Sequence, residues 1–329
     1  MKTHAITFDK PGPPDVLTWT EIAAPAPAPD EVMIDVQAAG INNADLLQRR
    51  GAYPVPQGAS PILGLECSGT ISWVGSEALG WKIGDPVCAL LTGGGYAEQV
   101  AVPWEQVLPV PKGIDLVQAA GLPEAACTVY SNLYMRAELR AGMSLLIHGG
   151  GSGIGTFAIQ WAKALGVTVI TTAGSESKLH RCAQLGADIL INYREADFSE
   201  QTLLATDGTG VDRILDIVGA DYLARNLNCL APDGHLVIIG STGPRPDPTL
   251  PLRSLMMKRH SVTATTLRAR PREQKAAIVQ AVRADVWPLF ESGQIVPVID
   301  SVLPMPDAAH GHRLLAEGQT IGKVLLRVP

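Results

Sequence analysis

The chain has 329 residues, of which 46% are hydrophobic and 18% charged, a composition typical of a globular protein with two domains rather than a disordered or fibrous one. Its formal net charge of −6 provides no basic field for nucleic-acid phosphates or anionic lipids. The first residues lack a signal-peptide pattern and no apolar run is long enough to span a bilayer, so we expect a cytoplasmic protein with no nucleic-acid or membrane partner.

The first 122 residues consist of short alternating segments separated by turn residues. In Glu31–Val36, for example, Val32, Ile34 and Val36 fall on one face of a predicted strand. This pattern predicts an irregular β domain over residues 1–122.

After residue 122 the pattern changes to alternating strands and helices. Six apolar β-type runs are Ser144–His148, Val167–Thr172, Asp188–Ile191, Val211–Val218, His235–Gly240 and His260–Thr265. Helical patterns separate most of them, for example at Thr156–Leu165, Glu176–Leu185 and Asp221–Leu230. The alternation predicts an α/β Rossmann domain over residues 123–265, with a six-stranded, doubly wound parallel sheet.

The remaining residues, 266–329, form a tail with its own elements. The pattern predicts a long helix at Arg272–Ser292, a strand at Val298–Leu303, a short helix and a last strand at Gly322–Val328. Sequence alone does not show on which domain this tail packs.

A glycine-rich turn stands between the first predicted strand and helix of the Rossmann domain. It runs from Gly149 to Gly155, and in a G-x-G-x-x-G alignment on its last glycine, Ser152 takes the middle position between Gly150 and Gly155. Such a turn lets the backbone approach a pyrophosphate, and the N–H groups at the helix start attract its charge. We therefore expect Gly150, Ser152, Gly153 and Ile154 to bind a dinucleotide, with Gly153 giving the close backbone approach.

The end of the second predicted strand indicates which dinucleotide binds. NAD enzymes place an acidic residue there for the ribose hydroxyls, whereas this chain has Ala173 and Gly174. Ser175 and Lys178 follow and could hold a 2′-phosphate, so the sequence favours NADPH, although Glu176 would oppose a phosphate if it pointed inward. The structural alternative is a helix-capping serine and a solvated lysine.

Metal-ligand patterns are missing from the sequence. The five cysteines are scattered and never form CxxC, which indicates buried free thiols, and the one close histidine pair, His310 and His312, is expected to be exposed. We therefore predict no metal site. Without a Lewis acid the acceptor should be reactive by itself; a quinone fits best and a conjugated enone next, because both delocalise the charge that hydride transfer creates.

Several segments spread over nearly the whole chain resemble the zinc-free, zeta-crystallin-like quinone oxidoreductases of the medium-chain dehydrogenase/reductase superfamily, and most of all their stress-inducible, tumour-suppressor-regulated branch. The segments are residues 40–54 (GINNADLLQRRGAYP), 62–66 (ILGLE), 94–98 (GGYAE), 122–125 (LPEA), the glycine turn, 172–175 (TAGS), 192–193 (NY), 266–270 (TLRAR) and 321–323 (IGK). The resemblance implies a GroES-like catalytic domain to which the tail returns, NADPH bound along the Rossmann domain, and a homodimer, or a tetramer of dimers, formed through the sheet edges of that domain.

The resemblance also implies roles for individual residues. Asn42 should lie near the nicotinamide and substrate, and Tyr53 should line the quinone pocket. Cofactor contacts are implied for Thr128, Gly174, Lys178, Tyr193, Gly240, Leu267 and Lys323. Each of the key residues has a structural alternative: a loop residue for Asn42, packing for Tyr53, a helix position for Thr128 and surface stacking for Tyr193. Some relatives have a tyrosine where Leu47 stands, so a proton here would come from water or Tyr53.

Three hypotheses follow for the function. The first is hydride transfer from NADPH to a small-molecule quinone; the second is reduction of an enone or 2-alkenal, which needs a proton delivered to carbon. The third is a nucleotide-binding protein with little turnover, because this fold can persist without catalysis.

Overall fold

The computed structural model describes residues 2–241 and 249–329. The chain divides into two compact units: a first unit of Met1–Cys127 with Leu267–Pro329, and a second unit of Thr128–Thr266. Each unit has its own sheet and its own buried core. Among the described residues, no helix is both long enough and apolar enough to cross a membrane.

The second unit is built on a six-stranded sheet in the order β10-β9-β8-β11-β12-β13. Its strands are β8 (Ser144–His148), β9 (Thr168–Ala173), β10 (Ile189–Asn192), β11 (Val211–Asp216), β12 (Leu230–Ile238) and β13 (Ser261–Ala264). All neighbouring strands pair in parallel. Strands β8 to β10 are added towards one side of the sheet and β11 to β13 towards the other, so the strand order reverses between β8 and β11. Doubly wound sheets bind their ligands at this point, at the carboxyl ends of the strands.

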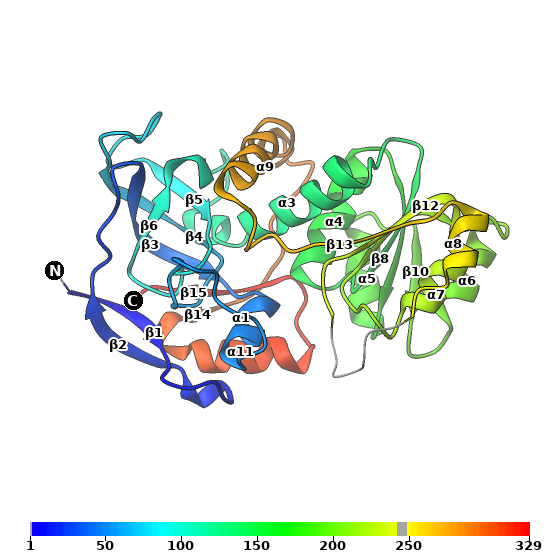
Figure 1. Ribbon diagram of the computed structural model, residues 1–329, viewed down its shortest axis with the longest axis horizontal. Helices are drawn as coiled ribbons and strands as arrows, with labels where there is room; N and C mark the ends of the chain where they lie inside the picture. Colours follow the sequence, from blue (N-terminus) through cyan, green and yellow to red (C-terminus); the bar gives the residue numbers. More distant parts are fainter. Residues whose placement is uncertain (1, 242–248) are drawn as a thin grey trace. The chain divides into compact units, whose positions relative to one another are not determined.

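Helices cover both faces of this sheet (Figure 1). They are η3 (Tyr130–Arg136), α4 (Gly153–Ala164), α5 (Glu176–Gln184), α6 (Phe198–Ala205), α7 (Leu223–Asn228) and α8 (Leu252–Lys258), and α3 (Pro123–Val129) precedes them. Helices α4 and α5 connect strands on one side of the β8–β11 reversal, and α7 and α8 connect strands on the other, so right-handed crossovers place the two pairs on opposite faces. The predicted doubly wound sheet is confirmed, and the boundaries of every strand except β8 differ from the prediction at one or both ends.

The first unit contains a seven-stranded, mostly antiparallel sheet in the order β14-β15-β3-β4-β5-β7, with β6 also paired to β3, and a two-stranded β1-β2 ribbon. Its strands are β1 (Lys2–Thr7), β2 (Thr18–Ala23), β3 (Glu31–Gly40), β4 (Glu66–Val74), β5 (Pro86–Leu90), β6 (Gln99–Pro103), β7 (Val107–Pro109), β14 (Ile299–Pro304) and β15 (Lys323–Arg327). Strand β15 pairs antiparallel with β3, so the tail supplies two strands of this sheet.

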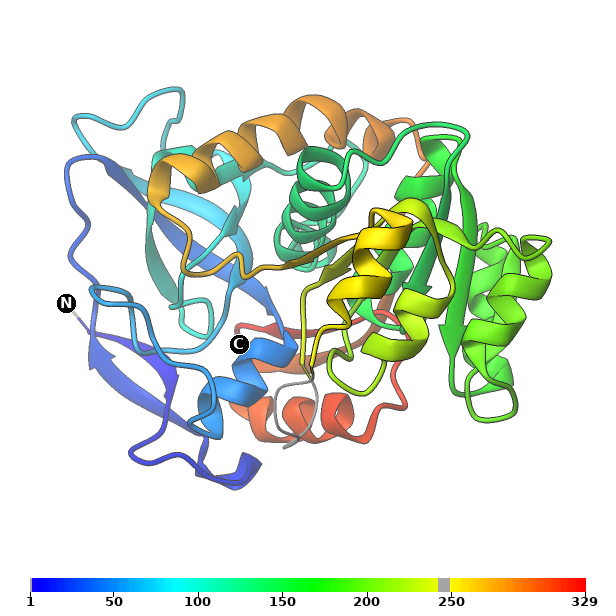
Figure 2. The same ribbon diagram turned by 45° about the vertical axis from the view of Figure 1, so that its right-hand side comes forward.

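Helices of the first unit come from both ends of the chain. They are η1 (Pro14–Val16), α1 (Asn43–Arg49), η2 (Trp104–Gln106), α2 (Leu116–Ala119), α9 (Arg272–Asp285), α10 (Trp287–Glu291), η4 (Met305–Asp307) and α11 (Ala308–Glu317). Figure 2 shows the blue α1 beside the red α11, in agreement with their direct contacts. Residues far apart in the sequence therefore meet around α1.

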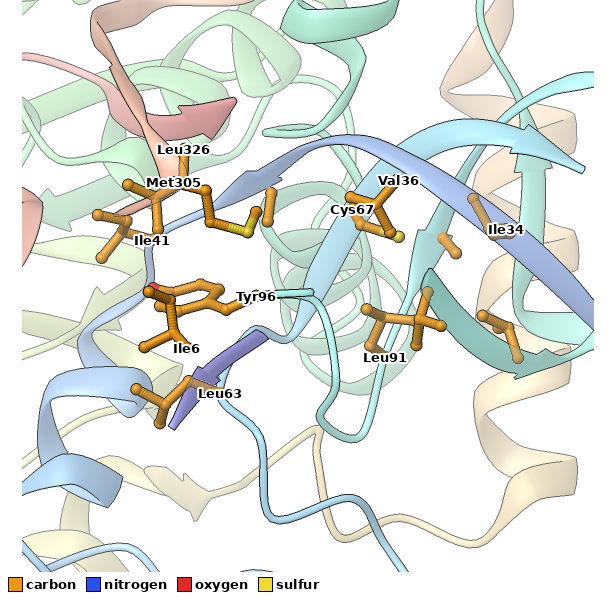
Figure 3. Close-up of a cluster of buried hydrophobic side chains, with 14 of the residues drawn as sticks. Ile6, Ile34, Val36, Ile41, Leu63, Cys67, Leu91, Tyr96, Met305 and Leu326 are labelled. Atoms are coloured by element: carbon orange, nitrogen blue, oxygen red, sulfur yellow. The ribbon is translucent and has the colours of Figure 1, made fainter. Parts of the chain in front are cut away.

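Figure 3 shows side chains of the buried core of the first unit. Ile34, Val36 and Cys67 from β3 and β4 are buried there, and Met305 and Leu326 come from the tail. Val32, Ile34 and Val36 all belong to this core, as predicted for one face of the strand, although Met33 between them is buried as well. The five cysteines are buried free thiols, as their scattered spacing predicts.

One predicted element is wrong. The helix expected at Arg272–Ser292 is two helices, α9 and α10, with Val286 between them. Pro288 is within the first two residues of α10, and a proline there lacks the N–H that a continuous helix needs and clashes with the preceding turn. The apolar periodicity continues through this break, which is why the pattern alone suggested one helix.

Candidate functional site

The glycine turn of the second unit is too tightly packed for larger residues. Gly149 has a φ of +71°, which favours glycine. A Cβ on Gly150 would lie 2.2 Å from Thr171 Oγ1 and 2.8 Å from Cys182 Sγ, and a Cβ on Gly155 would lie 2.3 Å from Gly149 O. Glycine at these positions therefore lets strand, turn and helix approach each other as a dinucleotide turn requires.

Ser152, at the middle position of the fingerprint, caps helix α4. Its Oγ donates to Gly149 O at 2.7 Å and accepts from Gly155 N at 3.0 Å. Because the first intrahelical bond starts at Thr156 N, the N–H groups of Gly153 and Ile154 lie in the open first turn. The predicted anion-binding residues thus occupy a helix N-terminus at the carboxyl end of β8.

The carboxyl ends of β9 and β10 bring together most of the residues predicted to select the nucleotide. A Cβ on Gly174 would lie 2.5 Å from Tyr193 Oη and 3.1 Å from Arg194 Nε, and a Cβ on Gly151 would lie 3.0 Å from Lys178 Cδ. Lys178 therefore runs along the glycine turn, and Tyr193 and Arg194 lie against Gly174.

Three further polar residues, Ser175, Glu176 and Arg194, lie near the ends of β9 and β10. Ser175 is the N-cap residue of α5, but its side chain makes no capping hydrogen bond and instead contacts Ser177 Oγ at 3.1 Å. Glu176 is exposed. Arg194 is exposed as well and adds a second cation that the sequence analysis did not consider.

A series of buried polar side chains links the carboxyl ends of β8, β9 and β11 through helix α7. Asp216 accepts from Asn226 Nδ2 at 3.0 Å, and Asn226 Oδ1 lies 2.7 Å from His148 Nε2. His148 Nδ1 lies 3.0 Å from Thr172 Oγ1, which in turn accepts weakly from Gly149 N at 3.4 Å. We call this series the strand-end relay; it ties three strand ends to the glycine turn.

The charge states of the strand-end relay follow from its burial. Burial lowers the pKa of His148 to about 4 and raises the pKa of Asp216 to about 6. Near neutral pH the imidazole is therefore uncharged. Since Asn226 donates its amide hydrogen to the carboxylate, its oxygen must accept from His148 Nε2–H, and Thr172 donates to Nδ1.

The other predicted cofactor residues of the second unit are Thr128 and Gly240. Thr128 is buried and its carbonyl accepts from Asn132 Nδ2 at 2.8 Å. Gly240 follows β12, and a Cβ there would lie 2.7 Å from Ile217 O. Gly240 thus brings the β12 loop close to the end of β11.

In the first unit, Asn42 and Lys323 meet on a buried carboxylate. Lys323 Nζ forms an ion pair with Glu66 Oε1 and donates to Asn42 Oδ1 at 2.8 Å. Asn42 Nδ2 donates to Glu66 Oε1 at 2.9 Å and weakly to Gly40 O at 3.4 Å, while Glu66 Oε2 accepts from Glu124 N at 2.9 Å. The amide of Asn42 is therefore fixed in one orientation.

These residues do not fit a zinc ion. Zinc requires three or four thiolate, imidazole or carboxylate ligands. Within residues 2–241 and 249–329, no group of three or more His, Cys, Asp and Glu side chains is placed to hold a metal. Beside Asn42, the Glu66 carboxylate is already neutralised by Lys323, whose ammonium would repel a cation.

A second buried network holds the backbone of Asn42. Asp45 Oδ2 accepts from Asn42 N at 2.8 Å and from Tyr96 Oη at 3.2 Å. His312 connects the tyrosine to Arg49, with Nε2 at 3.3 Å from Tyr96 Oη and Nδ1 at 3.1 Å from Arg49 Nη1. Burial raises the pKa of Asp45 to about 6 and lowers that of His312 to about 3. The expectation that His312 is exposed is wrong, because it fills the core and bridges these partners.

Tyr53 and Leu267 lie elsewhere in the first unit. Tyr53 is half-buried beneath Arg268, whose guanidinium carbon is 5.5 Å from the ring centre, and burial raises the pKa of its phenol. The phenol therefore remains protonated near neutral pH. Leu267 is buried.

Sequence reasoning missed Glu66, Arg194, Arg268 and the strand-end relay. Two of these carried a signal: Glu66 is a charged residue among apolar neighbours, and Arg194 stands shortly after the third strand of a sheet whose ends were expected to bind a ligand. The relay had none, because its members come from four separate segments.

Two protein families match this chain. Residues 28–112 match the family described as Alcohol dehydrogenase GroES-like domain, and residues 153–283 match the family described as Zinc-binding dehydrogenase. The predicted GroES-like and Rossmann folds are thereby confirmed.

Curated relatives are similar over nearly the whole chain. The quinone oxidoreductase of Pseudomonas aeruginosa is 34% identical over 324 residues, and the 2-haloacrylate reductase of a Burkholderia species is 30% identical over 327 residues; each match covers 98% of both chains. A polyketide synthase subunit of Mycobacterium tuberculosis is 30% identical over 325 residues, but this chain spans only 15% of that protein's length.

Solved structures are similar as well. Escherichia coli quinone oxidoreductase complexed with NADPH has a TM-score of 0.85 at 30% identity, covering 99% of this chain and 100% of that chain. A mycobacterial protein complexed with NADPH has a TM-score of 0.90 at 28% identity, covering 98% and 99%.

The strand-end relay predicts how acid affects stability. An unfolded histidine titrates near 6.5, whereas folded His148 titrates near 4, so the unfolded state takes up the proton first as the pH falls and stability is lost between these values. Between about pH 7.5 and 5, the free energy of unfolding should fall by about 2 kcal/mol more in the unsubstituted protein than in His148→Gln. Urea unfolding at both pH values measures this difference. The exposed His310→Gln should behave like the unsubstituted protein, and an equal pH effect in all three would contradict the assignment.

Proposed function

Because this chain belongs to the medium-chain dehydrogenase/reductase superfamily, we propose that it is an NADPH-dependent oxidoreductase that reduces quinones without zinc. The assignment of NADPH rests on one observation. Gly174, Ser175, Lys178, Tyr193 and Arg194 form a nucleotide corner of glycine, hydroxyl and cationic groups at the ends of β9 and β10. The assignment of the acceptor is supported by the poor fit of the first-unit residues to zinc and by the quinone oxidoreductases among the relatives.

The glycine turn fits the pyrophosphate of NADPH. Gly150 keeps the turn close to β9, and Gly153 and Ile154 direct N–H groups outward from the helix start, where the helix dipole adds attraction for an anion. Ser152 fixes the turn by capping rather than by a free hydroxyl. When bound, NADPH supplies the hydride from its nicotinamide ring.

The corner beside Gly174 fits a 2′-phosphate. Ser175 offers a hydroxyl, Lys178 and Arg194 offer charge, and Tyr193 offers a phenol and a flat face. No acidic residue stands at the end of β9 to bind an unphosphorylated ribose. Thr128, Gly240, Leu267 and Lys323 are proposed as further cofactor-binding residues from the resemblance alone.

Asn42 and Tyr53 would orient the acceptor. The amide of Asn42 keeps its orientation, and its hydrogen that makes only a weak bond to Gly40 O would donate to an acceptor oxygen placed beside it. Lys323, bonded to the same amide, would stabilise the negative charge that develops on that oxygen after hydride arrival. The protonated phenol of Tyr53 can then donate a proton, directly or through water.

Within the superfamily, we place the chain in the zeta-crystallin-like group and its stress-inducible branch, on the segments that carry that resemblance. A second candidate is reduction of a double bond conjugated to a carbonyl or carboxyl group. The similarity to a 2-haloacrylate reductase favours it. The two differ in that double-bond reduction requires a proton delivered to carbon.

We also propose that two copies pair through the β13 edge of the second unit's sheet. Strand β13 is an edge strand, and α8 near it exposes Leu252, Met256 and Met257 at 66%, 77% and 74%. An edge strand beside exposed apolar side chains favours pairing of β13 with the β13 strand of a second copy.

Substitution on α8 tests this pairing. Sedimentation should show a dimer, or a tetramer of dimers, for the unsubstituted protein and a smaller species for Met256→Lys with Met257→Lys. Leu204→Lys, equally exposed on α6, is the control and should leave the mass unchanged. A monomer before any substitution would refute the proposal.

The nucleotide corner predicts a loss of selectivity when its cations are removed. Lys178→Ala should raise the KM for NADPH about tenfold while leaving the KM for NADH nearly unchanged, because only the phosphorylated ribose loses a charge-assisted bond. Arg194→Ala should act in the same direction, and Arg181→Ala, on the same helix as Lys178, is the control. Equal use of both nucleotides by the unsubstituted protein would show the assignment to be wrong.

One assay separates the candidate reactions. NADPH oxidation is followed with ortho-quinones, para-quinones, enones and alcohols, each with and without a chelator. We expect the highest kcat/KM for quinones and no effect of the chelator. Enones turning over well above quinones would favour the second candidate, loss of activity on chelation would overturn the zinc-free claim, and tight NADPH binding without any turnover would favour a binding protein.

A further inference from the structure

The first unit contains a pocket of about 620 Å³ that includes neither Asn42 nor Tyr53 in its lining. Its walls come from the loop after Tyr53, the end of β5, strand β6 and the start of the tail. Apolar side chains such as Ile62, Leu91 and Val100 form part of the wall, and Arg268 and Lys275 form another part. The pocket therefore combines an apolar surface with four cationic residues, of which Arg268 and Lys275 are buried.

Arg268 is the least satisfied of the polar groups there. Only 3% of the residue is exposed, its Nε donates to Thr92 O at 2.8 Å, and Nη1 and Nη2 are buried with no hydrogen-bond partner among the described residues. A Cβ on Gly93, which lines the pocket, would lie 3.5 Å from Nη2. Arg268 is itself one of the lining residues, and its Nη2 lies beside Gly93, which has no side chain to cover it.

Lys275 brings a second buried charge to the same place. The residue is 5% exposed, and its Nζ donates to Thr92 Oγ1 at 2.5 Å and to Arg268 O at 3.5 Å. Neither Lys275 nor Arg268 forms an ion pair within the described part of the chain. Burial lowers the pKa of both, and the carboxylates of Glu124 and Asp45 attract them only from beyond ion-pair distance.

The remaining charged residues of the lining are two further arginines, Arg270 and Arg272, and one acidic residue, Glu31, so they do not cancel these two charges. Arg272 is matched by its own carboxylates, Asp30 and Glu105. Glu31 is the acidic residue of the lining, and its carboxylate accepts from Ala28 N at 2.8 Å. Burying an unpaired cation costs several kcal/mol, and water can fill its hydrogen bonds without neutralising its charge.

We propose that this pocket binds a small organic carboxylate, with the carboxylate group facing Arg268 and Lys275 and an apolar body against Ile62, Leu91 and Val100. A planar, bidentate carboxylate matches the two unpartnered guanidinium nitrogens. The apolar walls exclude a bare inorganic anion as the best ligand, because such an ion would leave them in contact with water. This site does not depend on the proposed hydride transfer.

Two sources can supply this chemistry. The carboxylate can belong to the acceptor itself, since Arg268 also stacks on Tyr53, or to a separate effector. Both place the same group in the same pocket, and kinetics distinguish them.

Binding of 2-naphthoate to the intact protein tests the proposal by calorimetry, with 2-naphthamide as the uncharged analogue of the same shape. We expect naphthoate to bind at least about tenfold more tightly, because only the carboxylate pairs with the buried cations. Equal affinity for the two compounds, or no saturable binding of naphthoate, would overturn the proposal. This comparison needs no substitution and holds even if a variant does not fold.

Substitutions then locate the binding. Arg268→Gln and Lys275→Gln should each weaken naphthoate binding about tenfold and leave naphthamide unaffected. Lys112→Gln, an exposed lysine of the same unit, and Lys178→Ala, at the nucleotide corner, should leave naphthoate binding unchanged. Loss of binding in Lys178→Ala alone would place the carboxylate in the nucleotide site and refute the pocket.

Inhibition kinetics identify the source of the carboxylate. If naphthoate competes with the acceptor, the pocket belongs to the acceptor's own binding site, and carboxylated quinones should have a higher kcat/KM than their amides. If inhibition or activation is not competitive, the pocket takes an effector. Both results support a carboxylate site.

Discussion

The proposed chemistry of the first unit depends on one buried ion pair, between Lys323 and Glu66. Both charges are almost fully buried, so each would cost several kcal/mol if it stood alone. The pair is tolerated because every remaining acceptor has a donor: Asn42 and the backbone of Glu124 complete the coordination of the carboxylate. Asn42 is therefore held by both members of the ion pair, and the positive charge beside it is the ammonium group of Lys323.

In the second unit, several loops must keep fixed positions around one ligand. Because the strands are parallel, the loops after β8, β9 and β11 all lie at the carboxyl end of the sheet, and the glycine contacts bring their backbones close together. The strand-end relay then connects the ends of these strands through side chains that are buried and hydrogen-bonded to one another. Such networks make a site rigid before the ligand arrives, which lowers the entropic cost of binding.

Local pattern predicted the elements of the second unit well, because βαβ units leave a strong periodic signal and the glycine turn stands at a fixed place within them. Strand Ser144–His148 agrees with its prediction at both ends. The contacts that organise the first unit leave no such signal: Lys323 and Glu66 are 257 positions apart, and Arg49 and His312 are 263 apart. His312 also has polar neighbours in sequence, so only its distant partners explain its burial. Roles for Asn42 and Tyr53 came from resemblance and stay predictions.

The pairing of β15 with β3 has a consequence for how the protein is made. A ribosome delivers the chain from its first residue onward, and the second unit is one continuous stretch whose strands are all complete once β13 has emerged. The sheet of the first unit, by contrast, has a vacant place next to β3 until β15 has been synthesised. The nascent chain must therefore carry an unfinished sheet edge through most of translation, and the middle of the sequence can reach its native form before the beginning does.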